Sequence, residues 1–110
     1  MDISVREANG VNILDFSGSL DTNTSPAAED EVNKLIAAGC DKILFNFKEL
    51  DYISSSGLRI LLATAKKLKV SDGMMQLCSL NSVVQEVFDI SGFADILSLS
   101  VNEEDALASF

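Results

Sequence analysis

The sequence predicts one α/β domain with a mixed, mainly parallel β-sheet, an N-terminal hairpin and about four helices. Strand-like and helix-like segments alternate along most of the chain, a pattern that favours right-handed crossovers between parallel strands. Asn9-Gly10 separates the first two apolar segments, and this pair is a strong signal for a β-hairpin. A chain of 110 residues is long enough for one hydrophobic core and too short for two, so we expect a single domain over residues 1–110.

The first part of the chain contains the hairpin and a helix. Apolar and polar residues alternate over residues 2–8, and a more apolar segment follows over residues 11–18, so both predict strands. A polar loop then leads to Ser25-Pro26, which predicts a helix start with Ser25 as the cap and Pro26 at the first helical position. Apolar residues recur at helical spacing after it, and Gly39 marks the end of this helix.

The central part of the chain predicts a strand, a helix and another strand. Residues 42–47 are almost continuously apolar, as expected for a strand that is covered on both faces. Residues 48–52 then lead to a helix whose apolar spacing starts at Ser56 and whose end is predicted near Gly73. Residues 74–80 form another apolar segment and predict a further buried strand.

The last part predicts two helices on either side of a final strand. Ser82 and Gln85 stand at the spacing of a capping box, and Gly92 marks the end of the helix that they begin. Residues 96–101 predict the last strand, and Asn102 predicts the cap of the last helix. In sheets of this kind, functional residues gather where strands end and helices begin.

Charge and hydropathy disfavour several classes of partner. Seventeen acidic residues against eight basic ones give a net charge of −9, so the chain is repelled by nucleic acid and by anionic lipid. No apolar stretch approaches the roughly 20 residues of a membrane-spanning helix. The first ten residues include an early acidic residue and no apolar core, unlike a signal peptide. We therefore expect a cytoplasmic protein with no direct nucleic-acid partner and no membrane partner.

The reactive side chains argue against catalysis. The sequence has no histidine, the commonest base for activating a serine nucleophile, and Cys40 and Cys78 stand far apart. Zinc and haem sites are therefore poorly supported. Thr64 and Lys67 have the spacing of a Ser/Thr-Lys pair, but they lie within an amphipathic helix that lacks the rest of such a site. We expect a protein that is not an enzyme, with no catalytic residue, no metal site and no cofactor.

Three consecutive serines, Ser54, Ser55 and Ser56, stand before Gly57 at one strand-to-helix junction. A helix cap needs only one side chain, so the other two hydroxyls have two possible roles. In the first, they complete a tight turn, and Gly57 lets the backbone approach closely. In the second, one hydroxyl is displayed for phosphorylation, because a helix N-terminus accommodates a phosphate that adds about 1.5 to 2 negative charges.

The serine run lies within DYISSSGLRILL at residues 51–62, and two further stretches accompany it: FSGSLD at residues 16–21 and VFDISGFADIL at residues 87–97. Together these stretches resemble STAS domains, and specifically the small stand-alone anti-sigma factor antagonists of bacteria. The serine stretch is the most specific of the three. The resemblance covers nearly the whole chain, and it implies a STAS-like fold with the mixed sheet described above.

The resemblance also implies a phosphorylation-controlled partner switch in transcription regulation. Members bind an anti-sigma factor that is also a serine kinase, which frees a sigma factor. Phosphorylation by this kinase abolishes binding, and a metal-dependent serine phosphatase restores it. The family motif reads Asp-Ser-Ser/Thr-Gly, so Ser55 is the implied phosphorylation site, and Ser54 stands where the family has aspartate. The implied partner-binding residues are Asp21, Ser54, Ser56 and Gly57.

Two other functions remain open at this point. The domain is alternatively a STAS scaffold or interaction subunit of another system, such as lipid transport or secretion control. An enzyme with a serine nucleophile is disfavoured because the chain has no histidine. A phosphorylatable serine at the implied position favours the antagonist.

Overall fold

The first two strands form the hairpin that the sequence predicts. In the computed structural model, which describes all 110 residues, β1 (Asp2–Ala8) pairs antiparallel with β2 (Val11–Leu20). Asn9 and Gly10 have φ angles of +54° and +78°. Both angles lie in the left-handed region that a two-residue turn of type I′ needs at its two central positions. The hairpin turn that Asn9-Gly10 predicts is therefore confirmed.

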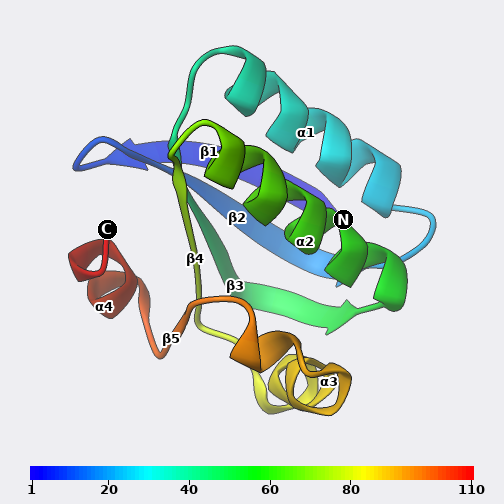
Figure 1. Ribbon diagram of the computed structural model, residues 1–110. Coiled ribbons are helices and arrows are strands. Elements are labelled where there is room, and N and C mark those ends of the chain that lie inside the picture. Colours follow the sequence, from blue (N-terminus) through cyan, green and yellow to red (C-terminus); the bar gives the residue numbers. More distant parts are fainter.

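The remaining strands continue the sheet in parallel. The strand order is β1-β2-β3-β4-β5, and every pair after the hairpin is parallel (Figure 1). A mixed, mainly parallel sheet with an antiparallel edge is thus confirmed. The three later strands are β3 (Lys42–Ile53), β4 (Met74–Cys78) and β5 (Leu99–Ser100).

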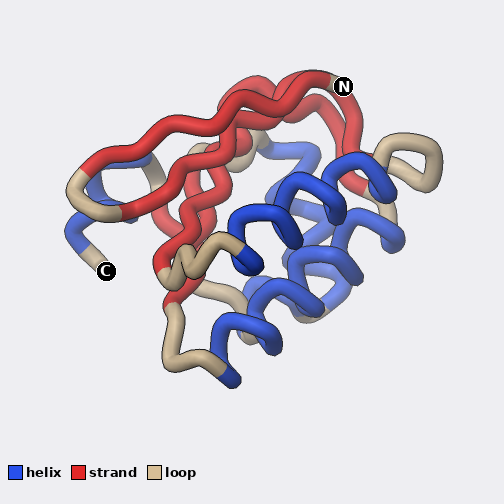
Figure 2. Tube along the Cα trace, turned by 90° about the horizontal axis from the view of Figure 1, so that it is seen from above, coloured by secondary structure: helices blue, strands red, loops and turns tan.

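Four α-helices pack against the sheet, as the sequence predicts. They are α1 (Ser25–Ala37), α2 (Ser55–Val70), α3 (Ser82–Ser91) and α4 (Glu103–Ala108), with a short 3-10 turn at Phe93–Asp95. Helices α1 and α2 run side by side over one face of the sheet (Figures 1 and 2). No helix of the chain is long and apolar enough to span a membrane.

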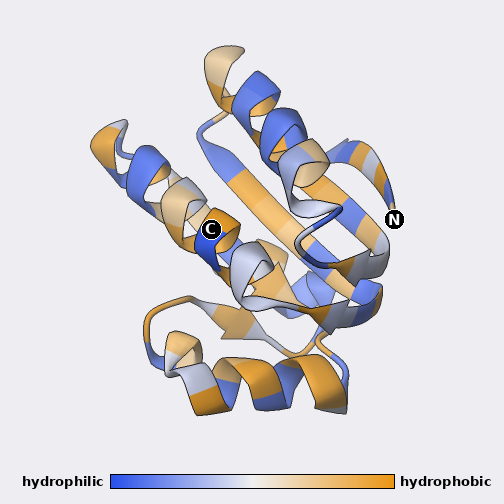
Figure 3. Ribbon diagram, turned by 90° about the vertical axis from the view of Figure 1, so that its right-hand side faces the viewer, coloured by the Kyte–Doolittle hydropathy of each residue, from blue (hydrophilic) through white to orange (hydrophobic).

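The core is divided between the two faces of the sheet. On one face, the rings of Phe16, Phe45 and Phe47 lie with centroids 5.4 to 6.0 Å apart, in a large cluster to which α1, α2 and α3 contribute. On the other face, a small cluster forms beneath α4 from Val11, Ile13, Leu44, Cys78 and Ala106. Figure 3 shows largely apolar strands and helices that carry both polar and apolar residues; on α3, Val83 and Ile90 are exposed.

Strand β3 is longer than the sequence predicts. Residues 48–52 were expected to lead from the strand to the serines, but β3 continues to Ile53 and stays paired with β2. The pairing shifts register between Asp15 and Ser17 and again between Gly18 and Ser19. These irregularities let Leu50 and Ile53 both be fully buried although they are three residues apart. Because burial does not alternate here, a period-two sequence pattern does not detect this part of the strand. Since β3 extends to Ile53, Ser54 follows it directly.

Two predicted helix caps and one strand are also wrong in detail. Ser25 lies inside α1, after Thr24, and its hydroxyl donates to the carbonyl of Asp21 instead of capping the helix. Asn81, not Ser82, caps α3, because its side chain accepts a hydrogen bond from the Val84 N–H at 2.8 Å. The last strand is only Leu99–Ser100, because the N–H groups of Ile96 and Leu97 still bind the carbonyl of Phe93 in the preceding turn.

The predicted cap of the last helix is right. The Asn102 side chain accepts a hydrogen bond from the Asp105 N–H at 2.8 Å. Gly92, with φ +81°, ends α3 in the left-handed conformation that glycine adopts without strain. These termini set the helices on the sheet and complete the fold.

Candidate functional site

The ends of β2 and β3 bring two loops together at one edge of the sheet. Ser54 N–H donates a hydrogen bond to the carbonyl of Leu20 at 2.9 Å, where Leu20 is the last residue of β2. The hydroxyls of Thr22 and Ser56 lie 3.3 Å apart. Parallel neighbours end at the same edge, so the loop before α1 and the start of α2 form one surface.

Ser54 is the cap of α2. Its backbone is extended, with φ −95° and ψ 174°, and its hydroxyl oxygen accepts a hydrogen bond from the Gly57 N–H at 3.3 Å. A serine in this position satisfies one of the donors that every helix start leaves unpaired. The structural need for a serine is met by this one residue.

Ser55 and Ser56 occupy different surroundings. Ser55 is the first residue of α2; it is exposed, and its hydroxyl has no hydrogen-bond partner within the chain. Ser56 is half-buried, and its hydroxyl contacts that of Thr22. One of the three serines therefore caps the helix, one joins the neighbouring loop, and Ser55 alone displays a free hydroxyl.

Gly57 is buried beneath the helix start. A Cβ atom at this position would lie 2.8 Å from Cγ1 of Ile53 and 2.9 Å from Cγ of Leu20. It would also lie 3.0 Å from the carbonyl oxygen of Leu20. Glycine thus lets the first turn of α2 press against the ends of both strands, and this close packing fixes the direction in which Ser55 points.

Asp21 lies in the loop beside the start of α2, and its carboxylate is used by its own turn. One carboxylate oxygen accepts hydrogen bonds from the N–H groups of Asn23 at 2.9 Å and Thr24 at 3.1 Å. The Asp21 carbonyl accepts from the N–H of Ser25 at 2.8 Å. Asp21 therefore shapes the loop that carries Thr22 toward Ser56.

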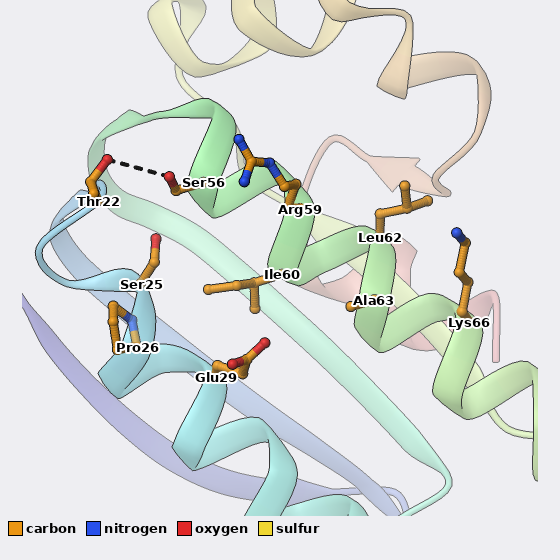
Figure 4. Close-up of a pocket in the computed structure, with 10 residues that line it drawn as sticks. All are labelled: Thr22, Ser25, Pro26, Glu29, Ser56, Arg59, Ile60, Leu62, Ala63 and Lys66. Carbon is orange, nitrogen blue, oxygen red and sulfur yellow. Dashed lines mark hydrogen bonds between the residues drawn. The ribbon is translucent and has the colours of Figure 1, made fainter.

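A groove of about 560 Å³ runs from this surface between α1 and α2 (Figure 4). Its α2 side carries two cations, Arg59 and Lys66, and its α1 side carries Glu29. The full lining consists of Thr22, Ser25, Pro26, Glu29, Ser56, Arg59, Ile60, Leu62, Ala63 and Lys66. The motifs of the sequence do not point to Arg59, although its position four residues after Ser55 is a usable signal.

Helix α2 concentrates positive charge on an acidic protein. Four of the eight basic residues of the chain lie on α2, and the helix contains no acidic residue: its cations are Arg59, Lys66, Lys67 and Lys69. The whole chain has a net charge of −9. Three of these cations lie among the last five residues of α2, so Arg59 is the α2 cation nearest to the free hydroxyl of Ser55.

A separate cluster of charged residues lies at the start of α4. Arg6 forms ion pairs with Asp15 and Glu103, and Asn46 donates a hydrogen bond to Glu103 at 3.0 Å. The hydrogen bond from Arg6 is the main cause of a lowered pKa at Glu103, and the two acidic partners raise the pKa of Arg6. Burial raises the pKa of the Cys78 thiol beneath the same helix. These interactions hold α4 on the sheet.

Comparison with known proteins gives the family of this fold and site. The STAS domain family matches residues 2–106, which is nearly the whole chain. The chain belongs to the STAS domain family. The protein BtrV of Bordetella bronchiseptica is 34% identical over 110 residues, which are 100% of this chain and 95% of BtrV. An anti-sigma F factor antagonist of Paenibacillus polymyxa is 32% identical over 97% of this STAS protein and 92% of its own length.

A solved relative has the same fold. The structure of the Bacillus cell fate determinant SpoIIAA in its phosphorylated form superimposes with a TM-score of 0.74. The match covers 98% of each chain at 21% sequence identity. The STAS-like fold that the sequence resemblance implies is thus confirmed, and so is membership of the anti-sigma factor antagonist group within the STAS family.

Proposed function

We propose that this STAS protein is an anti-sigma factor antagonist that is switched by phosphorylation of Ser55. In its unmodified form it binds an anti-sigma factor that is also a serine kinase, and the sigma factor is released. The observation that carries this proposal is the exposed Ser55 hydroxyl, which is free while both neighbouring serines are engaged. The name of the Paenibacillus relative and the phosphorylated form of SpoIIAA support it further.

The chemistry of the switch is phosphoryl transfer at the Ser55 oxygen. The kinase transfers the γ-phosphoryl group of ATP to this oxygen, so a P–O bond to serine forms while the bond to ADP breaks. The hydroxyl proton passes to a base of the kinase. A metal-dependent serine phosphatase reverses the modification by hydrolysing the phosphate ester with water. The STAS protein itself needs no catalytic residue, cofactor or metal for either step.

The phosphate acts on the partner surface and leaves the fold intact. It adds about 1.5 to 2 negative charges at a position that an unmodified partner contact has to cover. A partner that covers this charge has to remove it from water, and this desolvation is unfavourable by several kcal/mol, on the order of the penalty for one buried ion. Ser55 makes no hydrogen bond within the chain, so its modification removes none from the fold.

The residues around Ser55 complete the proposed partner-binding surface. Ser54 and Ser56 frame the modified residue on the first turn of α2. Asp21 shapes the loop beside them, and the buried Gly57 sets the height of the helix start above the strands. We assign all four to partner binding, directly or through this geometry. The protein works in the cytoplasm through protein partners, without direct contact to DNA, RNA or membrane.

Phosphorylation by the cognate kinase tests the site assignment. The protein is incubated with the anti-sigma kinase and ATP, and its peptides are sequenced by mass spectrometry. We expect phosphate on Ser55 in the unmodified sequence and none in Ser55→Ala. The matched control Ser56→Ala, one residue along, keeps the phosphate on Ser55. Phosphate on Ser54 or Ser56 with Ser55 unmodified contradicts the assignment.

Binding of the same kinase tests the electrostatic mechanism. Ser55→Ala keeps its affinity because a small neutral side chain adds no charge at the contact. Ser55→Asp binds more weakly, because like charges across an interface disfavour association by up to several kcal/mol, roughly the range known for mismatched charges. Isothermal titration calorimetry measures both variants. Equal affinity of Ser55→Asp and the unmodified protein is evidence against an electrostatic switch.

A further inference from the structure

Arg59 is an unpaired cation close to the proposed phosphorylation site. It is exposed on α2, and it takes part in none of the ion pairs or side-chain hydrogen bonds of the chain. Figure 4 shows its guanidinium extending along the helix toward Ser56 and the start of α2. Helical side chains generally lean toward the N-terminus in this way. The guanidinium therefore points to the turn that carries Ser55.

The spacing of Ser55 and Arg59 suits a side-chain contact. Residues i and i+4 of a helix are surface neighbours, with Cβ atoms about 5 to 6 Å apart. An anion placed N-terminal to a cation at this spacing is the favourable orientation of such a pair. A phosphate on the Ser55 oxygen projects further from the backbone than a carboxylate, and the arginine fork matches its oxygens in a bidentate contact.

We propose that Arg59 is the intramolecular partner of phosphoserine at position 55. This inference rests on the proposed phosphorylation of Ser55 and adds its recognition within the chain. The guanidinium donates two hydrogen bonds to the phosphate and anchors it on the first turns of α2. In the unmodified protein the same guanidinium is free.

The pairing has two consequences for the switch. Arg59 balances part of the added charge, which keeps the helix start ordered although the chain is strongly acidic. It also holds the phosphate at a fixed place on the partner-binding surface instead of letting it swing into solvent. The modification therefore blocks a defined contact and leaves the packing of α2 unchanged.

Lys66 provides a matched comparison on the same helix. It lines the same groove between α1 and α2 and carries the same charge as Arg59. It stands eleven residues after Ser55, which is roughly 16 Å along the helix axis at 1.5 Å per residue. If only the net charge mattered, neutralising either cation would change the proton affinity of the phosphate by a similar amount. If the phosphate contacts Arg59 directly, only the substitution of Arg59 changes it.

A phosphate titration tests the proposal without any kinase. Phosphoserine is incorporated at position 55 during translation, and its phosphorus NMR signal is followed against pH. A nearby guanidinium favours the dianion, so the phosphate of the otherwise unchanged protein loses its second proton at lower pH than in Arg59→Gln. We expect at least about a threefold weaker proton affinity, which is less than a close opposite charge produces at a buried site because Ser55 and Arg59 are both exposed. Lys66→Gln titrates like the unchanged protein, and Arg59→Lys lies between the two.

The outcomes separate this proposal from the proposed function. Equal titration of the unchanged protein and Arg59→Gln overturns the pairing, and so does an equal shift in Lys66→Gln. Melting of the unphosphorylated Arg59→Gln shows that the exposed substitution leaves the fold unchanged. The titration contains no kinase, so it does not test the antagonist function. That function is contradicted instead if the kinase binds the phosphorylated and the unmodified protein equally well.

Discussion

The starts of α2 and α3 follow neighbouring parallel strands, and they are built in different ways. At α3, Asn81 accepts a hydrogen bond from the Val84 N–H at 2.8 Å and donates one to the Leu50 carbonyl at 2.8 Å. At α2, the cap Ser54 accepts from the Gly57 N–H at the longer distance of 3.3 Å. The asparagine side chain thus both caps α3 and ties it to β3, whereas the Ser54 side chain makes one hydrogen bond, which is longer.

The third residue of each helix shows the same contrast. Val84 is fully buried in α3, whereas the corresponding position of α2 is Gly57, where a Cβ atom would clash with β2 and β3. The start of α2 is therefore held by close backbone packing, and its side chains are released. At the start of α3, which has a structural role only, the Asn81 side chain makes two hydrogen bonds. The start of α2 leaves the Ser55 hydroxyl free, as a modification site needs.

Replacing Gly57 with alanine breaks the α2 start most strongly. The new Cβ atom meets Ile53 and Leu20 at 2.8 and 2.9 Å. Overpacking of this kind costs about 1 to 3 kcal/mol, which exceeds the gain of about 1 kcal/mol from the better helix propensity of alanine. Thermal melts measure the loss of stability. Ser55→Ala, two residues earlier and exposed, is the control and stays within about 0.5 kcal/mol. Unchanged stability of Gly57→Ala contradicts the close packing described for this helix start.

Removing the capping side chains has a smaller effect on stability, and the effect differs between α2 and α3. Loss of a cap typically lowers the free energy of unfolding by about 1 kcal/mol. Asn81→Ala also loses the bond to the Leu50 carbonyl, whereas Ser54→Ala loses only the 3.3 Å contact. We expect Asn81→Ala to be the more destabilising of the two in urea unfolding. The reverse order shows that the serine run has a larger structural role than its geometry indicates.

The start of α4 extends the comparison to a helix held by charge. Arg6 lowers the pKa of Glu103 below its usual value of 4.5, so the ionised carboxylate stabilises the fold. This contribution is fully present above about pH 4.5 and is lost as the pH falls through the lowered pKa. Because the ion pair is partly exposed, we expect about 0.2 to 1 kcal/mol.

Urea unfolding of Glu103→Gln at two pH values measures this contribution. The variant is less stable than the unchanged protein at pH 7, and the difference shrinks at a pH well below the lowered pKa. Glu104→Gln, at the neighbouring position, is the control because Glu104 takes part in none of the chain's ion pairs. A difference that stays constant with pH rules out the ion pair as its cause.

The order of the helices and strands is predictable from the sequence because it depends on local sequence patterns that tertiary packing does not override. Hydrophobic periodicity identifies the helices, and the Asn9-Gly10 pair fixes the hairpin through its left-handed backbone. The run of serines before Gly57 marks the candidate site because a cap needs one hydroxyl only. These signals are local, so no knowledge of the sheet is needed to detect them.

The remaining details depend on contacts between distant segments. Ser25 and Ser82 are suitable caps by residue type, but the hydrogen bonds of the folded chain shift each helix start by one residue. The last residues of β3 lack a regular period because the register shifts against β2 decide which of them are buried. The freedom of Arg59 also emerges only from the structure, since no acidic side chain reaches it.

The central claim is that Ser55 is displayed for a switch that acts on the partner and spares the fold. Its most direct test compares the protein phosphorylated at Ser55 with the unmodified form in a kinase-binding titration and a thermal melt. We predict that affinity falls at least tenfold, which is about 1.4 kcal/mol. The melting temperature shifts by only a few degrees, since the local electrostatic effects are roughly 1 kcal/mol or less against a domain stability of about 5 to 15 kcal/mol. Unchanged affinity contradicts the switch, and a large loss of melting temperature shows that phosphorylation acts by unfolding the start of α2.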